Sequence, residues 1–297
     1  MPRTWKTRLV MGAIPAAAAG VALLMGPSPR QVAPGEPLPD LVEFAPGSFQ
    51  YRVEGDFTRG GRPARAPIVA AITHALAVMR HQVTVGEYRR CVEAGACRRG
   101  DETAAVDVPM VRISWWDAAG YATWLSRSTG MSFRLPSDEE WVYVAGSRFR
   151  DSEGPPDTDS DSRDPGKRAL DRYEQETAIR NETDPEPRPV GHFGANEHGL
   201  LDVAGNVWEW TDSCFARGII DAGGEPSTTT VDCGVRVVEG RHRTYLTDFI
   251  RDARAGGCTA GLPPGNLGFR LVLDDDWRRR LHAFADRVKR ALTARAI

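Results

Sequence analysis

Hydrophobic and polar positions alternate in short runs of different period, which predicts a domain containing both strands and helices. Residues 41–44 and 48–53 read as two short strands joined by the turn Pro46-Gly47. Three helices are predicted where a Ser or Thr is followed three residues later by an acid, because such a pair can cap the first turn reciprocally. These helices begin after Thr84, Ser114 and Ser137. Gly95 and Gly130 are expected to end the first two, since glycine adopts the left-handed conformation that follows many helices.

The N-terminal residues 1–30 have the pattern of an export segment. Three basic residues precede an uncharged run over residues 9–26. Two interpretations remain open, a cleaved signal peptide and a retained membrane anchor, because no clear small-residue cleavage site follows the run. A linker rich in Pro and Gly, residues 31–38, leads to the domain, residues 39–273. We therefore expect a periplasmic or other extracytoplasmic protein, with membrane anchoring if the segment is retained.

Two further segments differ from the rest of the domain. Residues 151–189 are rich in Pro, Asp, Ser and Arg and are expected to form a surface insertion. Residues 274–297 carry a hydrophobic stripe at helical spacing and predict a C-terminal amphipathic helix. The stripe would pack on its own domain, in a groove of a partner, or on a membrane surface.

Composition narrows the class of protein. Of the 297 residues, 41% are hydrophobic and 26% are charged, as in folded globular proteins. The 38 Lys and Arg residues nearly balance the 40 Asp and Glu residues, so no net charge draws the chain to nucleic acid. Nucleic acid is not an expected partner.

The chain has five cysteines, which can form disulfides in an oxidising compartment. Because five is odd, at least one cysteine must stay unpaired within the chain. Proximity along the chain favours a bridge between Cys91 and Cys97 and another between Cys214 and Cys233. Cys258 would then stay unpaired.

Five segments, in order along the chain, carry a distinctive combination of residues: His81-Gln82-Val83-Thr84, Val111-Arg112-Ile113-Ser114-Trp115, residues 133–141 (FRLPSDEEW), residues 199–210 (GLLDVAGNVWEW) and Asn266-Leu267-Gly268-Phe269-Arg270. Their order and spacing resemble the formylglycine-generating enzyme (sulfatase-modifying factor) family. This resemblance implies an irregular α+β domain of C-type-lectin-like fold, with little regular secondary structure for its size. The turn after the first predicted helix also looks like that of bacterial relatives linked to nitrite-reductase gene clusters. A related exported branch matures the siderophore pyoverdine.

The fourth segment suggests a calcium site. Asp202 and Glu209 are hard oxygen donors on either side of a Gly-Asn turn, which suits calcium. In the family a similar loop binds calcium, and the resemblance implies the carbonyls of Gly205 and Val207 as further ligands. The alternative is a tight turn without an ion, held by hydrogen bonds from Asn206. Ca²⁺ is thus the expected cofactor.

The copper chemistry of the family is not expected here. Its oxidising members bind copper with two cysteines, and both are needed because paired thiolates hold Cu(I). In this chain no cysteine lies between Cys233 and Cys258. Counting along the chain places the two copper positions at Tyr245 and about Ile250.

Three functions follow from these patterns. The first is an exported maturation or accessory factor for a client protein or metabolite. The second is an oxidoreductase that uses the same cleft with other residues or another metal, with His242, Tyr245 and Arg254 as candidates. The third is a non-catalytic, lectin-like binding module. Stoichiometric copper or iron would indicate the second function, and calcium alone the first or third.

Overall fold

The structure is a computed structural model, and it describes residues 35–72, 74–100, 105–150, 186–241, 243–251 and 266–274. These residues belong to one compact unit, Val32–Ile297. The expected export segment, most of the insertion and the expected C-terminal helix lie outside the described residues. Within the described part, no helix has the length and apolar character needed to cross a membrane.

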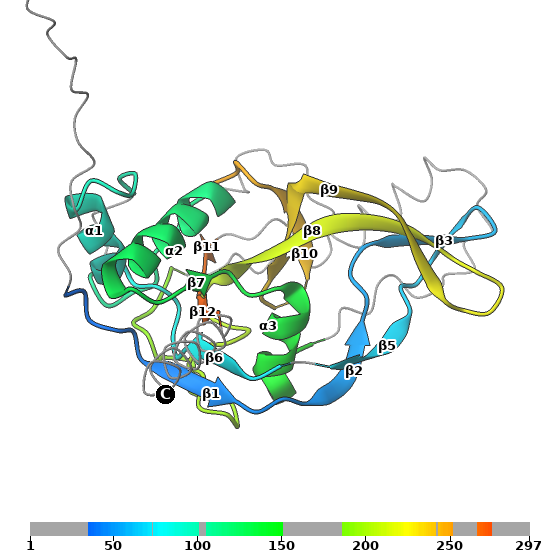
Figure 1. Ribbon diagram of the computed structural model, residues 1–297, viewed down its shortest axis with the longest axis horizontal. Helices are drawn as coiled ribbons and strands as arrows, with labels where there is room; N and C mark the ends of the chain where they lie inside the picture. Colours follow the sequence, from blue (N-terminus) through cyan, green and yellow to red (C-terminus); the bar gives the residue numbers. More distant parts are fainter. Residues whose placement is uncertain are drawn as a thin grey trace, which may run out of the picture. The chain divides into compact units, whose positions relative to one another are not determined.

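The described strands form three sheets (Figure 1). The first has the order β1-β6-β12-β7, the second the order β10-β9-β8-β3-β4 with β11 also on β8, and the third pairs β2 with β5. Pairing is antiparallel except where β3 and β11 meet β8. The bounds are β1 Leu41–Phe44, β2 Ser48–Arg52, β3 Asp56–Arg59, β4 Arg62–Ala64, β5 Ile68–Ile72, β6 Leu76–Met79, β7 Phe133–Arg134, β8 Trp208–Ile220, β9 Pro226–Glu239, β10 Thr244–Thr247, β11 Leu267–Gly268 and β12 Val272–Leu273.

The two predicted N-terminal strands are confirmed as strands, but they do not pair with each other. β1 pairs with β6, whereas β2 pairs with β5. The predicted turn at Pro46-Gly47 therefore carries the chain from one sheet to another. Gly47 also lies against Tyr143, because a Cβ atom there would meet the tyrosine hydroxyl.

All three predicted helices are confirmed at their expected starts. They are α1 (Val85–Glu93), α2 (Trp115–Thr129) and α3 (Asp138–Ala145). In each, the Ser or Thr side chain accepts a bond from the N3 backbone, and the N3 acid accepts one from the cap residue. Gly130 ends α2 in the left-handed conformation. A short 3-10 helix, Gly146–Arg148, follows α3.

The core has two buried clusters of apolar side chains. One lies between α1, α2 and the strands that cross beneath them, and the stacked rings of Tyr88 and Tyr121 belong to it. The other surrounds α3 and contains Trp141. Four buried tryptophans belong to these clusters, and two of them, Trp141 and Trp210, have no exposed surface, so tryptophans fill much of this irregular interior.

Both predicted disulfides are present. Cys91 at the end of α1 pairs with Cys97, and Cys214 on β8 pairs with Cys233 on β9. Cys258 lies outside the described residues. The second bridge joins the two long strands that extend away from the helices in Figure 1.

Candidate functional site

A tight turn from Asp202 to Glu209 leads into β8, and its backbone is unusual. Asp202, Ala204 and Asn206 have φ values of 55°, 57° and 62° although none is glycine. Each such residue costs on the order of 1 kcal/mol, so the surroundings must hold the turn in place. Asn206 contributes by accepting a hydrogen bond from Arg188 N and donating one to Arg188 O, both 2.9 Å long.

Glu209 closes the turn with a carboxylate that accepts four hydrogen bonds. Arg270 donates two of them, from Nε at 2.6 Å and Nη2 at 2.7 Å. Trp141 Nε1 and Gln82 Nε2 donate the others, both at 2.8 Å. Glu209 and Arg270 are both fully buried. Replacing either residue would leave the other as an uncompensated buried charge. This lowers the free energy of unfolding by about 3–5 kcal/mol.

Gln82 brings three oxygens of the turn together. Besides Glu209 Oε1, its Nε2 faces Asp202 O at 3.1 Å and Gly205 O at 3.5 Å. Its own Oε1 is buried and has no hydrogen-bond partner among the described residues. A half-turn of the amide exchanges its nitrogen and oxygen at almost no change in shape. In that orientation the Gln82 oxygen would join Glu209 Oε1 and the carbonyls of Asp202 and Gly205 as oxygens that a cation could bind.

Oxygens of this kind suit calcium, but they are not the full set of ligands expected from the sequence. The Asp202 carboxylate accepts hydrogen bonds from Gly191 N at 2.5 Å and Phe193 N at 2.7 Å. The Asp202 carboxylate, an expected ligand, is thus held by two backbone N–H groups, and it is the Asp202 carbonyl that faces Gln82. Among the described residues, no group of three or more His, Cys, Asp or Glu side chains could hold a metal. Carbonyl and amide oxygens, with Glu209, would have to supply the coordination.

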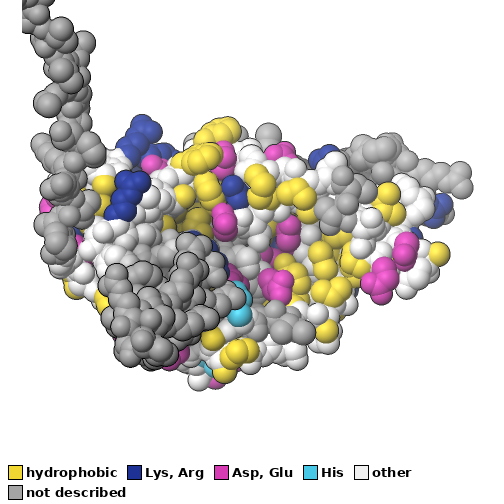
Figure 2. All heavy atoms as spheres, viewed as in Figure 1, with side chains coloured by type: hydrophobic (Ala, Val, Ile, Leu, Met, Phe, Trp, Pro, Cys, Tyr) yellow, Lys and Arg dark blue, Asp and Glu magenta, His cyan; other side chains and the backbone are white. Residues whose placement is uncertain are grey.

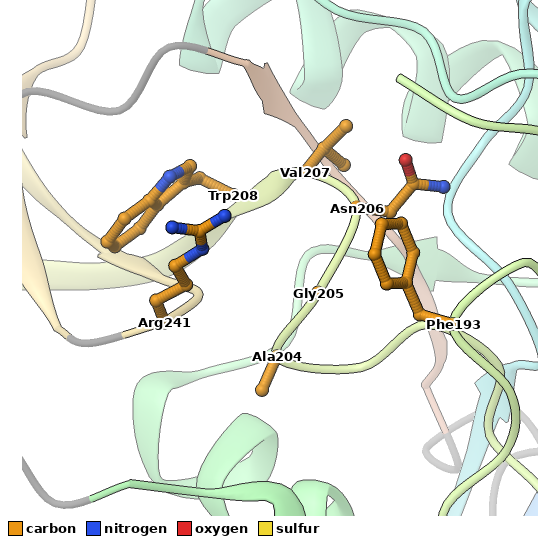
Figure 3. A pocket seen from close by; sticks show the side chains of 7 residues that line it. All are labelled: Phe193, Ala204, Gly205, Asn206, Val207, Trp208 and Arg241. Atoms are coloured by element: carbon orange, nitrogen blue, oxygen red, sulfur yellow. The ribbon is translucent and has the colours of Figure 1, made fainter. Parts of the chain in front are cut away.

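The other side of the same turn lines a pocket of about 150 Å³. In Figure 3 the guanidinium of Arg241 lies beside the indole of Trp208, and Phe193 stands across the turn. Val207, whose carbonyl is an expected calcium ligand, also lines this pocket. Gly240 permits the packing, since a Cβ there would lie 2.6 Å from the Trp208 ring. The lining residues are Phe193, Ala204, Gly205, Asn206, Val207, Trp208 and Arg241.

A second polar cluster lies where β2, α3, β9 and β10 meet. Asp138, fully buried at the start of α3, accepts a 2.5 Å hydrogen bond from the Tyr51 hydroxyl. Arg243 Nη2 pairs with the same carboxylate oxygen at 2.9 Å. Arg243 also donates from Nε to Glu239 Oε1 at 2.8 Å and from Nη1 to Arg52 O at 3.1 Å. One guanidinium thus serves two buried carboxyl groups.

The carboxyl groups of this cluster outnumber its cation, and this changes their protonation. Burial raises the pKa of Glu239 well above its usual range, and the nearby charge of Asp138 adds to the effect. Burial and then Asp138 likewise raise the pKa of Glu54 to about 8. At neutral pH Glu54 is therefore largely protonated.

Of the three candidates for catalysis, only Tyr245 is among the described residues. Its hydroxyl accepts a 2.9 Å hydrogen bond from Gly55 N, and burial, followed by the charge of Glu54, raises its pKa. It thus lies at the edge of the cluster around Asp138 and Arg243. His242 and Arg254 lie outside the described residues.

A comparison with protein families places these features in context. The model of the sulfatase-modifying factor enzyme 1-like domain matches residues 28–275. The chain belongs to this family. Its Asp202–Glu209 turn, Arg270 and the three capped helices are therefore parts of a shared domain.

Curated relatives include formylglycine-generating enzymes and an inactive homologue. The enzyme of Streptomyces coelicolor is 31% identical over 197 residues, covering 60% of this chain and 56% of its own length. The inactive C-alpha-formylglycine-generating enzyme 2 of mouse is 29% identical over 183 residues, covering 56% of this chain and 49% of its own. The chain thus spans about half the length of the curated relatives that it matches.

A solved structure confirms the fold class. PvdO from Pseudomonas aeruginosa superposes with a TM-score of 0.51 and 21% sequence identity, covering 84% of this chain and all of that one. The expected irregular α+β fold of the formylglycine-generating enzyme type is therefore confirmed.

The sequence did not reveal most members of the two clusters. Gln82, Asp138 and Arg270 lie inside the quoted family segments, but their partners are distant in the chain. Glu54 lies in the link between β2 and β3, where no local pattern marks it, and Glu239 is the last residue of β9. The one available signal was for Glu239, an acidic residue at a position that β-strand alternation would bury.

Proposed function

We propose that this protein is an exported family member that matures or assists another exported protein or metabolite without copper-thiolate chemistry. One observation carries this proposal. Of the five cysteines, four are used in the two disulfides, which leaves Cys258 alone. A Cu(I) site of the family type needs two thiolates, so a single chain cannot build it.

Export is supported by the same cysteines and by the N-terminus. Disulfides persist in oxidising compartments such as the periplasm. Residues 1–30 have the basic and uncharged pattern of an export segment. We propose a periplasmic or extracytoplasmic location, with the segment either cleaved or kept as a membrane anchor. Fractionation and N-terminal sequencing of the natural protein distinguish these two outcomes.

We also propose that the turn binds calcium as a structural ion. Glu209 Oε1, the carbonyls of Asp202 and Gly205, and Gln82 Oε1 would be its ligands. The orphaned Gln82 oxygen and the strained backbone of the turn support this proposal. An ion here would stabilise the approach to β8 and the wall of the pocket, and it takes no part in chemistry.

The test of function is an assay for formylglycine. A Cys-x-Pro-x-Arg peptide is incubated with the protein, copper and dioxygen, and the aldehyde is sought by mass spectrometry. We expect none, while the Streptomyces relative under the same conditions serves as the positive control. Aldehyde formation by this protein would contradict the proposal, and its loss in Cys258→Ala would identify that thiol as the ligand.

A further inference from the structure

The disulfide between Cys214 and Cys233 lies at an irregularity of the β8–β9 pair. Phe215 pairs with Asp232. Its neighbour Cys214 pairs with Arg236, so the register shifts at the disulfide and the residues between Asp232 and Arg236 form a bulge on β9. Cys233, within the bulge, is exposed to solvent, whereas Cys214 is partly buried. Cys233 is therefore the cysteine of the pair that a thiol in solution can approach.

Arg236 places a guanidinium against the other sulfur. Its Nη1 donates to Cys214 Sγ at 3.3 Å and to Asp212 O at 2.7 Å. The guanidinium carbon lies 3.9 Å from the centroid of the Trp115 ring, and this contact holds it in place. The Arg236 side chain is 11% exposed, and its Nε is buried without a hydrogen-bond partner among the described residues. The positive charge beside Cys214 is therefore fixed in position and poorly hydrated.

The two sulfurs have carboxylates in different places. Asp212 pairs with Arg236 through Oδ1, 3.4 Å from Nη1, but its side chain is 51% exposed. Water therefore screens the charge of Asp212 more than that of Arg236, so the guanidinium dominates at Cys214. Asp232, which precedes Cys233 in the chain, is exposed and accepts a 2.9 Å hydrogen bond from the backbone two residues on. The surroundings thus favour negative charge on the Cys214 sulfur over the Cys233 sulfur.

A guanidinium at this place stabilises the reduced state more than the disulfide. A disulfide sulfur is uncharged and accepts hydrogen bonds weakly, whereas the thiolate formed on reduction accepts a charge-assisted one. A cationic neighbour also favours the thiolate form of a cysteine. A disulfide whose reduced form is stabilised in this way is a stronger oxidant. Cys214 is therefore the better leaving group when a thiol attacks Cys233.

The disulfide also adjoins β10. Val235, in the bulge, pairs with Thr247. Phe215, which follows Cys214, meets the Tyr245 ring edge to face with centroids 4.9 Å apart. The disulfide is therefore next to the strand that carries Tyr245, one of the positions counted for copper in the family.

We propose that the Cys214–Cys233 disulfide is a thiol–disulfide exchange site that oxidises two thiols of a client peptide. A client thiolate attacks Cys233 Sγ, a bond from the client to Cys233 forms, and the Cys214–Cys233 bond breaks. Its electron pair leaves with Cys214 as a thiolate beside Arg236. The second client thiolate then attacks the client sulfur of the mixed disulfide, and Cys233 leaves.

The electrons of this exchange balance between client and protein. The client loses two electrons, the protein disulfide gains them, and the protons of the client thiols pass to water or to the released cysteines. Oxidised glutathione, or another small disulfide, restores the Cys214–Cys233 bridge by the reverse exchange. Arg236 is a positioning residue that stabilises the leaving thiolate.

The inference rests on the proposed function only for the nature of the client, so its test uses glutathione alone, without client or copper. The natural protein is equilibrated with reduced and oxidised glutathione at a series of ratios, quenched with acid and alkylated. Peptide mapping then gives the reduced fraction of each disulfide. Cys91–Cys97 is the internal control, because Cys91 is fully buried in the core. We expect Cys214–Cys233 to be half reduced under conditions at least about tenfold more oxidising than those that reduce Cys91–Cys97.

Two variants test the role of the guanidinium. Arg236→Met should shift the glutathione equilibrium about threefold to tenfold towards the disulfide, because the thiolate loses its cation. Arg217→Met is the matched control and should leave the equilibrium unchanged. Arg217 also lies on this strand pair with its guanidinium against an aromatic ring, 5.5 Å from the Phe215 centroid.

The pH dependence of alkylation in the reduced protein reads out the thiolate directly. We expect the midpoint for Cys214 to lie at least about one pH unit below that for Cys233. Arg236→Met should remove this difference, whereas Arg217→Met should keep it.

Two results would overturn the inference. Reduction of both disulfides under the same conditions would show that Cys214–Cys233 is a structural bridge. Equal alkylation midpoints for Cys214 and Cys233 would show that Arg236 does not stabilise the leaving thiolate. Both results come from the natural protein, so they stand even if Arg236→Met fails to fold. Neither depends on the formylglycine assay, which tests the proposed function separately.

Discussion

Glu54 and Glu209 show how two carboxyl groups of one domain acquire different roles from their neighbours. Glu209 is surrounded by four N–H donors, two of them from one guanidinium. Glu54 has a second carboxylate nearby and an oxygen without a hydrogen-bond partner in the described part of the chain. The first arrangement fixes a strand in position. The second holds a proton that is lost only at a raised pH.

The raised pKa of Glu54 predicts how the free energy of unfolding depends on pH. Because the pKa of Glu54 rises from 4.5 to about 8 on folding, the folded state holds this proton more tightly than the unfolded state. Its contribution to the free energy of unfolding is therefore fully present below pH 4.5 and is lost as the pH rises through about 8. Glu54→Gln removes this loss and should stabilise the protein at pH 9 relative to pH 5, by on the order of a few kcal/mol.

Urea denaturation of the two proteins at pH 5, 7 and 9 measures this effect. Glu197→Gln is the control, because its lowered pKa affects stability only as the pH falls towards 2. A difference between Glu54→Gln and the natural protein that stays constant from pH 5 to 9 would contradict the prediction.

Helices and strands differ in how far local sequence defines them. The three helix starts were predictable, because each capping pair, such as Ser137 and Glu140, acts within one turn. Strand partners were not predictable, since β1 pairs with β6 and β2 with β5 across intervening chain. A strand's alternation shows which side is buried, whereas its partner depends on contacts far away in sequence. The disulfides were predictable only because both partners lie close in the chain.

The pairing of β8 with β9 supports a prediction about the second disulfide. Cys214 and Cys233 are 19 residues apart, and Cys91 and Cys97 are 6 apart. Since a bridge restricts the unfolded chain more when it closes a longer loop, Cys214→Ala with Cys233→Ala should cost about 3 kcal/mol, against about 2 kcal/mol for the other pair. Urea denaturation at one pH provides both values. A larger loss from the Cys91 and Cys97 double variant would contradict this order.

At the scale of the whole molecule, a buried hydrogen-bond network supports the turn of the family domain. Glu209, Arg270 and Gln82 bind the turn to the strands around it, and these residues lie in the segments that revealed the family. Tyr245, at one of the positions counted for copper, accepts a hydrogen bond from Gly55 N, and burial followed by the charge of Glu54 raises its pKa. The sequence predicted the family and the turn correctly. The sequence could not show which way the Asp202 carboxylate points. Its hydrogen-bond donors are the backbone N–H groups of Gly191 and Phe193, and any residue other than proline has such a group.

A calcium titration tests whether the turn, Gln82 and Glu209 together form an ion site. If four oxygens from the turn and from Gln82 hold the ion, its binding energy adds to the stability of the folded state. At a free calcium concentration one hundred times the dissociation constant, the gain is about 2.7 kcal/mol, or roughly 5–10 °C in Tm for a domain of this size. Differential scanning calorimetry with calcium, magnesium or a chelator should show this increase for calcium alone, since magnesium keeps its water ligands.

Two variants show whether such an increase comes from the turn. Gln82→Met keeps the length of the side chain but removes the amide oxygen, so the calcium-dependent shift in Tm should shrink strongly. Glu225→Gln removes an exposed carboxylate at the far end of β8 and β9 and should leave the shift intact. Equal melting temperatures in calcium and chelator, with no calcium found by elemental analysis, would mean that the turn folds without an ion. In that case the Gln82 amide nitrogen itself, bonded to Asp202 O and Glu209 Oε1, would hold the strained backbone in place.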